Sequence, residues 1–273
     1  MNKNCLLDKQ IDLEVNSKVE FIGLKGRQWT LIFLKRIDRN IWKVREVDTR
    51  EIYVAKMGNK KVLMKELLLS RAAEKVCSTV HYYDFLTCED KFGILMEYCK
   101  WKTLRHTLRF RMINEDRKEI ALNVVKQLRK LHLGGMIHGD VKPANIMINE
   151  YEVFVEEEDI KLIDFGGGAF IQEGEKGNTI SPAYASIRLT LDYEQGFKIR
   201  STLIDELESE VYLVWYILRN GSLPWTGQPV DKIVEMKGIQ SDELLIVRLL
   251  EAASEGREED FLDLIDELWP SNT

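Results

Sequence analysis

The stretch "MIHGDVKPANIMIN", residues 136–149, places a carboxylate, an ammonium group and an amide between two apolar runs. These groups belong to Asp140, Lys142 and Asn145. Such residues suit a tight turn, in which Asx side chains bond to the backbone and proline fixes φ. They also suit a site that handles charged ligands. The rest of the chain has to decide between the two interpretations.

The bulk composition is that of an ordinary globular protein. The chain has 273 residues, 45% of them hydrophobic and 31% charged, enough for one large domain or two small lobes. The net charge of −6 disfavours nucleic acid as the main partner. The first residues lack the apolar core of a signal peptide, and no window approaches the roughly 18 apolar residues of a membrane span. Four scattered cysteines without a C-x-x-C pair predict reduced thiols in the cytoplasm or nucleus, with no membrane association.

The front third of the chain is predicted to form strands. Runs at 30–37, 41–47 and 51–57 are rich in β-branched and aromatic residues and are separated by polar turns, which indicates an antiparallel meander. Helical spacing over 60–76 predicts a helix. Two further strands are expected around 80–87 and 92–99, so the front part would hold five strands and one helix.

The rest of the chain is predicted to be mainly helical. Short apolar runs at 146–148 and 160–165 interrupt it. Helices are expected at 103–111, 117–135, 206–220, 230–237, 241–254 and 258–268. The helix over 206–220 is apolar nearly all round, so it should be buried. A small antiparallel β-sheet lobe with one helix, followed by a larger mainly α-helical lobe, is an α+β plan.

The opening stretch contains most of what phosphoryl transfer from ATP requires. That reaction needs a cation on the phosphates, oxygen ligands for Mg²⁺, and a carboxylate that orients the attacking hydroxyl. The string H-G-D-V-K-P-A-N matches H-R-D-L-x-x-x-N, with Gly139 in place of arginine. Asp140 would then orient the hydroxyl, and Lys142 would neutralise the transferred phosphate. Asn145, together with Asp164 of L-I-D-F-G, would ligate Mg²⁺.

Two further residues complete the candidate site. Lys56 ends a predicted strand in V-A-K, which matches V-A-I-K with one residue fewer. A buried ammonium needs an anion, and Glu66 on the following helix is the natural partner. The alternative is an exposed strand-end lysine. His138 is expected to tie the loop together rather than to act as an acid or base.

These motifs resemble those of the eukaryotic protein kinases over roughly residues 28–268. The strings SPAYASI (181–187), DELES (205–209) and GSLPW (221–225) are similar to casein kinase I. The strings KELLLSRAAEKV (65–76) and HGD are similar to the vaccinia-related kinases. The chain therefore resembles a divergent member of the superfamily that contains both groups.

The resemblance implies a bilobal kinase fold in a single domain, residues 1–273, with an N-lobe over about 20–98 and a C-lobe over 99–273. Met96 would be the gatekeeper, and Glu97, Tyr98 and Cys99 the hinge that binds adenine. Asp205 would fix the backbone of the catalytic loop. The implied activity is transfer of the γ-phosphoryl group of ATP, with Mg²⁺, to serine or threonine hydroxyls of protein substrates, by a monomer.

Three features depart from the family pattern. The flap from Ile37 to Val44, expected to lie over ATP, contains no glycine and has Trp42 where the family has a small residue. Gly139 replaces the arginine that reads a phosphate on the activation segment, so Thr179 and Ser181 need not be phosphorylated. The insertion 189–204 follows Arg188 and contains Lys198 and Arg200, which would form either an anion site or a solvated basic loop.

Three functions remain open at this point. The first is an active Ser/Thr kinase, supported by the complete set of charged residues. The second is a pseudokinase that acts as a binding or scaffold protein, supported by the glycine-free flap. The third is a small-molecule phosphotransferase, which also uses H-G-D followed by asparagine. The D-F-G and SPAYASI strings disfavour this third function.

Overall fold

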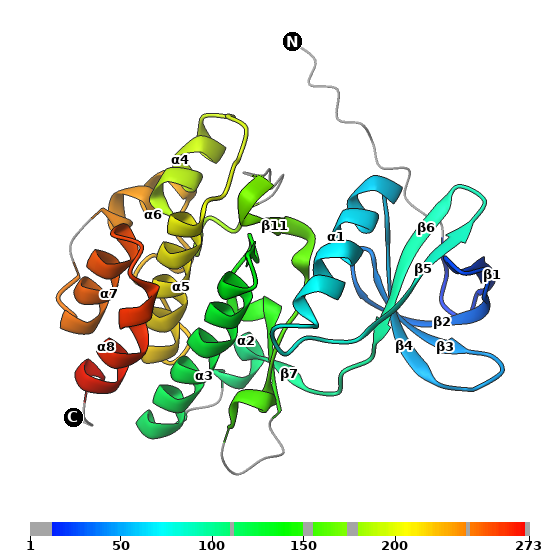
Figure 1. Ribbon diagram of the computed structural model, residues 1–273, viewed down its shortest axis with the longest axis horizontal. Coiled ribbons are helices and arrows are strands. Elements are labelled where there is room, and N and C mark those ends of the chain that lie inside the picture. Colours follow the sequence, from blue (N-terminus) through cyan, green and yellow to red (C-terminus); the bar gives the residue numbers. More distant parts are fainter. Residues whose placement is uncertain (1–12, 110–111, 150–154, 174–179, 239–240, 271–273) are drawn as a thin grey trace. The chain divides into compact units, whose positions relative to one another are not determined.

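The structure, a computed structural model, describes residues 13–109, 112–149, 155–173, 180–238 and 241–270. The chain divides into two compact units. The first comprises Met1–Arg71 and Val80–Lys100, and the second comprises Ala72–Thr79 and Trp101–Thr273. Strands dominate the first unit and helices the second (Figure 1). The predicted α+β class is confirmed.

The first unit is a closed antiparallel barrel in the order β1-β2-β3-β4-β6-β5. Its strands are β1 (Lys18–Ile22), β2 (Gln28–Asp38), β3 (Ile41–Glu46), β4 (Ile52–Gly58), β5 (Tyr82–Cys88) and β6 (Lys91–Glu97). The predicted meander corresponds to β2, β3 and β4. The short strand β1 was not predicted, although residues 18–21 alternate polar and apolar side chains. This strand closes the barrel by pairing with β2 and, through Ile22 and Thr87, with β5.

Large aromatic side chains fill the barrel. Trp29, Phe33, Trp42 and Tyr53 belong to one buried cluster. The ring of Trp42 meets that of Phe33 edge-on at 5.6 Å, and Trp42 is only 6% exposed. Trp42 therefore points into the barrel and is part of its core, rather than lying on the outer face of the β2–β3 hairpin.

Asp84 closes the barrel at the β1 end. Its buried carboxylate accepts hydrogen bonds from Trp29 Nε1 at 2.9 Å and from the Leu24 backbone N–H at 3.0 Å. The chain passes so close to this carboxylate that a Cβ at Gly23 would lie 1.9 Å from Asp84 Oδ2. Glycine is therefore needed at that position, and Asp84 links β5 to both ends of the β1–β2 connection.

The second unit is built around α3 (Asn114–Leu133) and α5 (Leu203–Leu218). Its other helices are α2 (Leu104–Thr107), α4 (Ile187–Glu194), α6 (Val230–Lys237), α7 (Leu244–Ser254) and α8 (Phe261–Leu268). The first unit contributes α1 (Lys60–Ala73), which ends within the second. As predicted, α5 is buried over most of its length. Among the described residues, none of the helices combines the length and apolar character that a membrane span requires.

Two small sheets carry the motif-bearing loops of this unit. One has the order β10-β9-β7, formed by β7 (Lys102–Thr103), β9 (Ile146–Ile148) and β10 (Ile160–Leu162). The other pairs β8 (Met136–Ile137) with β11 (Ala169–Phe170). These short strands hold the stretch 138–145 against the residues that follow Asp164.

Two sequence expectations change in this unit. The helix expected over 103–111 is the short α2, and Phe110 and Arg111 lie outside the described residues. The insertion expected as a loop over 189–204 contains most of α4. The hydroxyl of Ser186 accepts a hydrogen bond from the Leu189 N–H, so this serine caps the helix.

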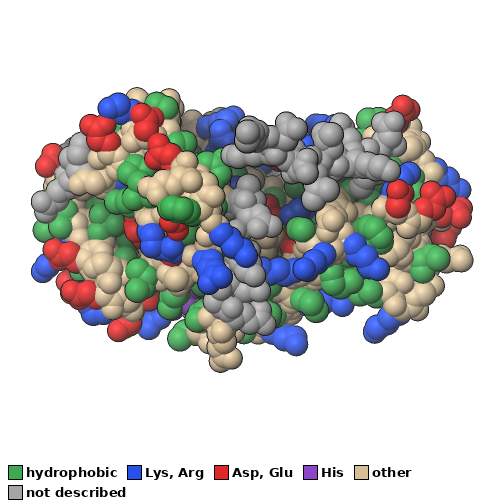
Figure 2. Space-filling view, turned by 90° about the horizontal axis from the view of Figure 1, so that it is seen from above, with side chains coloured by type: hydrophobic (Ala, Val, Ile, Leu, Met, Phe, Trp, Pro, Cys, Tyr) green, Lys and Arg blue, Asp and Glu red, His purple; other side chains and the backbone are tan. Residues whose placement is uncertain are grey.

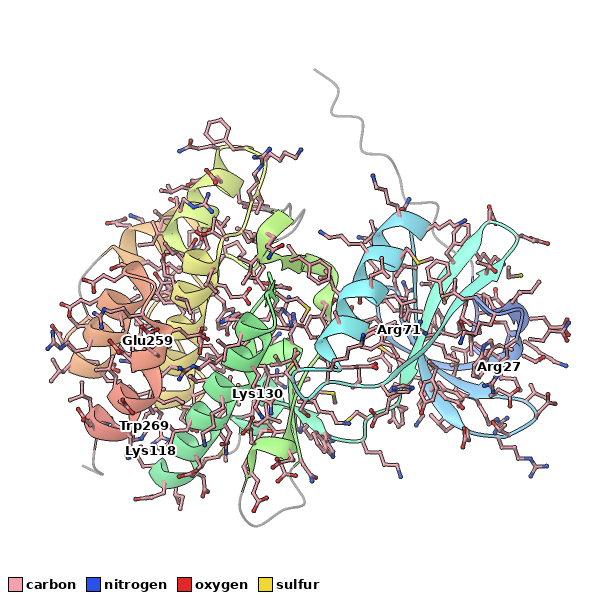
Figure 3. All side chains as sticks on the ribbon, in the orientation of Figure 1. Arg27, Arg71, Lys118, Lys130, Glu259 and Trp269 are labelled. Atoms are coloured by element: carbon pink, nitrogen blue, oxygen red, sulfur yellow. The ribbon has the colours of Figure 1, made fainter. Side chains whose placement is uncertain are left out.

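The C-terminal part of the described chain is tied to the start of α3. Trp269 Nε1 donates to Asn114 Oδ1 at 3.0 Å, and Lys118 Nζ donates to Asp266 Oδ1 at 2.7 Å. The labelled side chains of Lys118 and Trp269 show this junction in Figure 3. On the face of the helical unit seen in Figure 2, acidic and basic side chains are interspersed, as on most globular surfaces.

Replacing Asp84 tests the closure of the barrel. Asp84→Ala removes the acceptor of three donors, Trp29 Nε1 and the Leu24 and Phe85 N–H groups. We therefore expect the free energy of unfolding to fall by about 2–4 kcal/mol in urea titration. Asp90→Ala, at an exposed position in the β5–β6 turn, is the matched control and should change it by less than about 0.5 kcal/mol. Equal effects of the two substitutions would contradict this role of Asp84.

Candidate functional site

In the first unit, Lys56 and Glu66 form the ion pair that the sequence predicts. Lys56 Nζ on β4 donates to Glu66 Oε1 on α1 at 2.8 Å. The glutamate side chain is 1% exposed, whereas that of the lysine is 19% exposed. The ammonium is thus held in place by a buried carboxylate and still reaches solvent, so it could meet a phosphate.

The strand register corrects the expected motif. Val54 and Lys56 are two residues apart on β4 and therefore share one face, while Ala55 points into the barrel. The second and fourth positions of V-A-I-K share a face in the same way. The matching string is therefore Tyr53-Val54-Ala55-Lys56, and no residue is missing.

The same register overturns the prediction that Val44 contacts a nucleotide. Val44 is 0% exposed and belongs to the barrel core. Directly paired residues share a face of a sheet, and Lys43, Val54 and Met96 form one such row. Lys43 therefore occupies the face that carries Lys56. Its ammonium lies 4.1 Å from the centre of the Tyr98 ring.

The predicted gatekeeper and hinge residues follow one another from the end of β6. Met96 lies on the Lys56 face, half-buried. Glu97 donates its backbone N–H to His81 O at 2.8 Å, and its carboxylate accepts from the His81 N–H. Tyr98 and Cys99 follow outside any strand. The adenine-binding role of these residues stays a prediction.

The β2–β3 hairpin turns tightly without glycine. Arg39 and Asn40 alone separate the two strands. Arg36 Nε donates to Arg39 O at 2.9 Å, and the Asp38 carboxylate accepts from the Arg39 N–H at 2.6 Å. Ile37 is 50% exposed. The side chains of Arg36 and Asp38 therefore bond to the backbone C=O and N–H of Arg39. In the family motif, the backbone of this turn would face phosphates.

In the second unit, the structure brings Asp140, Lys142 and Asn145 together. Lys142 Nζ contacts Asp140 Oδ2, and Asn145 Nδ2 donates to Asp140 O at 2.9 Å and to Asp140 Oδ2 at 3.2 Å. Asn145 ends the short 3₁₀ turn η1 (Pro143–Asn145), which Pro143 begins. Its amide nitrogen is used by Asp140, so its oxygen is the atom that could ligate a cation.

A serine hydroxyl sits on the Asp140 carboxylate. Ser181 Oγ donates to Asp140 Oδ1 at 2.8 Å and accepts from Lys142 Nζ at 3.1 Å. Sequence reasoning considered Ser181 only as a phosphorylation site. Thr179, considered with it, lies outside the described residues.

Asp164 is connected to this loop through its neighbours. Its backbone is left-handed, with φ of 66°, and its carboxylate accepts from the Gly166 N–H at 3.4 Å. His138 Nε2 donates to Ile163 O at 2.9 Å, and its ring packs on Phe165 at 5.0 Å between centroids. The structural role predicted for His138 agrees with these contacts.

Gly139 replaces arginine for a steric reason. Its φ is +75°, and a Cβ there would lie 2.0 Å from Gly167 O. The segment after Asp164 thus runs directly against the H-G-D backbone, and a Cβ at Gly167 would in turn meet Gly139 O at 2.9 Å. The glycines of H-G-D and of the G-G-G run therefore form one close backbone contact.

The residue that holds this loop is Glu206, not Asp205 as the sequence analysis expected. Glu206 Oε1 accepts from the His138 N–H, and Oε2 accepts from the Gly139 N–H, both at 2.6 Å. Burial alone would raise the pKa of Glu206, but hydrogen bonds with His132 and the Gly139 N–H lower it overall. The carboxylate therefore stays ionised opposite two backbone donors.

Asp205 instead anchors α4 to the start of α5. Its carboxylate accepts from Ser186 Oγ at 2.7 Å, Arg188 Nε at 3.0 Å and Thr202 Oγ1 at 2.6 Å. Burial alone would raise the pKa of Asp205, but these bonds lower it. Arg188 also bonds Asp192 and Arg200 O. Because its guanidinium is used in this way, Arg188 does not support the anion site considered above.

His132 contacts the Glu206 carboxylate from α3. His132 Nε2 lies 2.9 Å from Glu206 Oε1, and Nδ1 lies 2.7 Å from Glu258 Oε1. Burial alone would lower the pKa of His132, but the two carboxylates raise it to about 10. Neither His132 nor Glu206 was selected from the sequence. The available signal was a pair of glutamates, 206 and 210, one turn apart on a helix that is apolar from Val211 onward.

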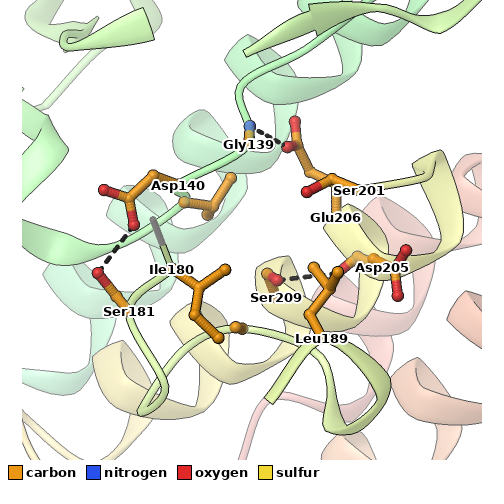
Figure 4. Close-up of a pocket in the computed structure, with 11 residues that line it drawn as sticks. Gly139, Asp140, Ile180, Ser181, Leu189, Ser201, Asp205, Glu206 and Ser209 are labelled. Atoms are coloured by element: carbon orange, nitrogen blue, oxygen red, sulfur yellow. Dashed lines mark hydrogen bonds between the residues drawn. The ribbon is translucent and has the colours of Figure 1, made fainter. Parts of the chain in front are cut away.

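A small cavity lies behind the catalytic loop (Figure 4). Its walls include Gly139, Asp140, Ser181, Asp205 and Glu206. Its volume is about 20 Å³, room for one water molecule. The cavity is too small for a substrate. It lies between the loop and the residues that hold it, among them Glu206.

The described residues fit the groups that phosphoryl transfer needs. Asn145 and Asp164 offer the amide and carboxylate oxygens that Mg²⁺ prefers. Lys56, fixed by Glu66, offers a cation for phosphates, and Asp140 already holds a hydroxyl.

Comparison with known families decides the identity. The model of the protein kinase domain matches residues 34–272. The chain belongs to the protein kinase family. The predicted resemblance is thereby confirmed, and the H-G-D-V-K-P-A-N and D-F-G strings lie within the matched residues.

Similar proteins come from distant organisms. The chain is 32% identical over 139 residues to "Probable serine/threonine-protein kinase PknB" of Bifidobacterium longum (strain NCC 2705), covering 49% of this chain and 19% of that protein. It is 30% identical over 141 residues to "Casein kinase 1-like protein HD16" of Oryza sativa subsp. japonica, covering 46% and 19%. The matches thus span about a fifth of the length of these relatives.

A solved structure shares the kinase fold over nearly the whole chain. The "Structure of vaccinia related kinase 3" superposes with a TM-score of 0.67 and 15% identity. The match covers 96% of this chain and 94% of that one. The casein kinase 1-like relative and this structural neighbour agree with the superfamily that the sequence resembles.

The close approach of the two glycine segments can be tested by adding one methyl group. Gly139→Ala should lower the free energy of unfolding by about 3 kcal/mol or more, since Gly167 must move and the left-handed backbone is strained. Gly135→Ala is the matched control: its φ is +78°, but nothing lies within 4 Å of the added Cβ. We expect about 1–2 kcal/mol there. Equal losses in denaturant titration would show that the contact with Gly167 is unimportant.

Proposed function

We propose that the chain is a protein serine/threonine kinase that transfers the γ-phosphoryl group of ATP to a protein hydroxyl. The observation that carries the proposal is the hydroxyl of Ser181, which donates to Asp140 Oδ1 at 2.8 Å with the Lys142 ammonium beside it. The same carboxylate could receive and orient the hydroxyl of a substrate, because the two groups need the same donor–acceptor geometry.

Each charged residue has a distinct role in this mechanism. Asp140 would orient the attacking hydroxyl and accept its proton. Lys142 would neutralise charge on the phosphoryl group in transfer. Lys56, held by Glu66, would position the phosphates. Asn145 and Asp164 would hold Mg²⁺, which supplies positive charge against the phosphate oxygens.

The segment that carries Ser181 is held firmly, which supports a polypeptide acceptor beside it. Trp225 Nε1 donates to Ala183 O at 2.8 Å, and Lys237 Nζ donates to Pro182 O at 2.8 Å. A substrate strand could therefore dock against a fixed surface. This favours protein over small-molecule acceptors.

A pseudokinase remains the second candidate, and the first unit supplies the observation that favours it. The β2–β3 hairpin binds its own backbone through Arg36 and Asp38. Lys43, a charged residue, lies on the Lys56 face against Tyr98. Both features would weaken nucleotide binding, and the protein would then act through binding alone.

The direct test is transfer of labelled γ-phosphate to casein and to the protein itself, with and without Mg²⁺. We expect incorporation by the wild type, and a fall of about 100-fold or more in Asp140→Asn, the size typical for loss of a general base. Lys56→Met should also abolish transfer. Asp90→Asn and Lys61→Met, at exposed positions, are matched controls that should behave as the wild type.

Two results would overturn the proposal. Transfer by Asp140→Asn at the wild-type rate would remove Asp140 from the mechanism. If the wild type shows neither incorporation nor a thermal shift with millimolar Mg-ATP, the chain functions as a binding module.

A further inference from the structure

A buried cluster of ionisable side chains lies in the core of the helical unit, apart from the residues assigned to transfer. His132 comes from α3, Glu206 and Glu210 from α5, and Glu258 from the 3₁₀ turn η5 (Glu258–Asp260). One ligand atom from each of His132, Glu210 and Glu258 lies within 4.8 Å of the others. All four residues are buried.

Glu210 is the member that the fold leaves unexplained. It is 0% exposed, and neither Oε1 nor Oε2 has a hydrogen-bond partner among the described residues. A buried carboxyl group without a partner is costly, so such groups are rare unless they serve a ligand. One of its oxygens lies within 4.8 Å of a ring nitrogen of His132 and of a carboxylate oxygen of Glu258.

We propose that His132 Nδ1, Glu210 and Glu258 form a binding site for a divalent transition-metal ion of the zinc class. One imidazole nitrogen and two carboxylates are a common donor set for zinc. Such a ligand histidine usually donates its other ring N–H to a carboxylate. Glu206 already occupies that position, 2.9 Å from His132 Nε2.

The geometry needs only small adjustments. Ligands about 2.1 Å from a tetrahedral ion lie about 3.4 Å apart. The His132 Nδ1–Glu258 Oε1 contact of 2.7 Å would open by several tenths of an ångström, and Glu210 would move inward from at most 4.8 Å. The Glu258 side chain is 11% exposed, so the ion would reach the cluster past η5.

An ion can bind in this position without changing the net charge of the cluster. A divalent cation, a neutral His132 and the carboxylates of Glu206, Glu210 and Glu258 sum to −1, and so do a protonated His132, a neutral Glu210 and the other two carboxylates without the ion. Binding would release to solvent the proton on His132 Nδ1 and the proton that a buried Glu210 otherwise retains. This metal site is separate from the proposed transfer reaction. It lies next to the H-G-D turn, because Glu206 also accepts hydrogen bonds from the His138 and Gly139 N–H groups.

The test uses the full chain after removal of metal by a chelator. Zinc is titrated in competition with a chromophoric chelator, and the melting temperature is followed. We expect one tight site per chain and a rise of about 5–10 °C at a hundredfold excess over Kd. Glu210→Gln should weaken binding by about tenfold or more. Glu243→Gln and His106→Gln, which alter a carboxylate and a histidine outside the cluster, should leave it unchanged.

Cobalt gives a second measurement that does not depend on whether the variant folds. The wild type should show the visible absorption of a low-coordinate Co²⁺ site, and zinc should displace it. Absence of this absorption together with absence of zinc stabilisation would overturn the proposal, as would equal affinity in Glu210→Gln. If Glu210→Leu stabilises the fold and the wild type binds no metal, Glu210 is a neutral buried acid and the site does not exist.

Discussion

The hydrogen bonds between the Glu206 carboxylate and the backbone of the H-G-D turn are the contact on which the rest of the helical unit depends. The carboxylate accepts from two consecutive backbone N–H groups, those of His138 and Gly139, and is itself backed by His132. Because a buried carboxylate needs such donors to stay ionised, the contact fixes α5, α3 and the H-G-D turn at once. Asp140, directly after the turn, can then hold a hydroxyl in a defined position.

The local sequence predicted the parts of the site that are contiguous in the chain. Asp140, Asn145 and Asp164 were selected as candidate site residues from the strings H-G-D-V-K-P-A-N and D-F-G. The pairing of Lys56 with Glu66 was predicted from their opposite charges. The supporting residues could not be found in this way. Adjacent acids at 205 and 206 look equivalent in a sequence, and only the helix phase decides that Asp205 turns to Arg188 and Glu206 to the loop.

In the barrel, too, the sequence predicted where strands lie but not which face each residue occupies. Periodicity located β2, β3 and β4, yet the expected contact at Val44 was wrong by one residue. A shift of one residue moves a side chain to the opposite face of a strand, and the register is set by the paired strands rather than by the motif. β1 was missed because it is only five residues long, and its pairing with β5, which closes the barrel, joins residues far apart in the chain. The glycine-free hairpin, by contrast, was visible in the sequence from the start.

The measurement that tests the central claim most directly is phosphoryl transfer by Glu206→Gln, beside Glu243→Gln as control. The substituted amide would place an N–H₂ group near a backbone N–H of the H-G-D turn, so one of the two anchoring bonds is lost. The account predicts a transfer rate reduced about tenfold or more, with nucleotide binding retained, since Lys56 and Glu66 are untouched. A transfer rate and melting temperature equal to those of the wild type would contradict it.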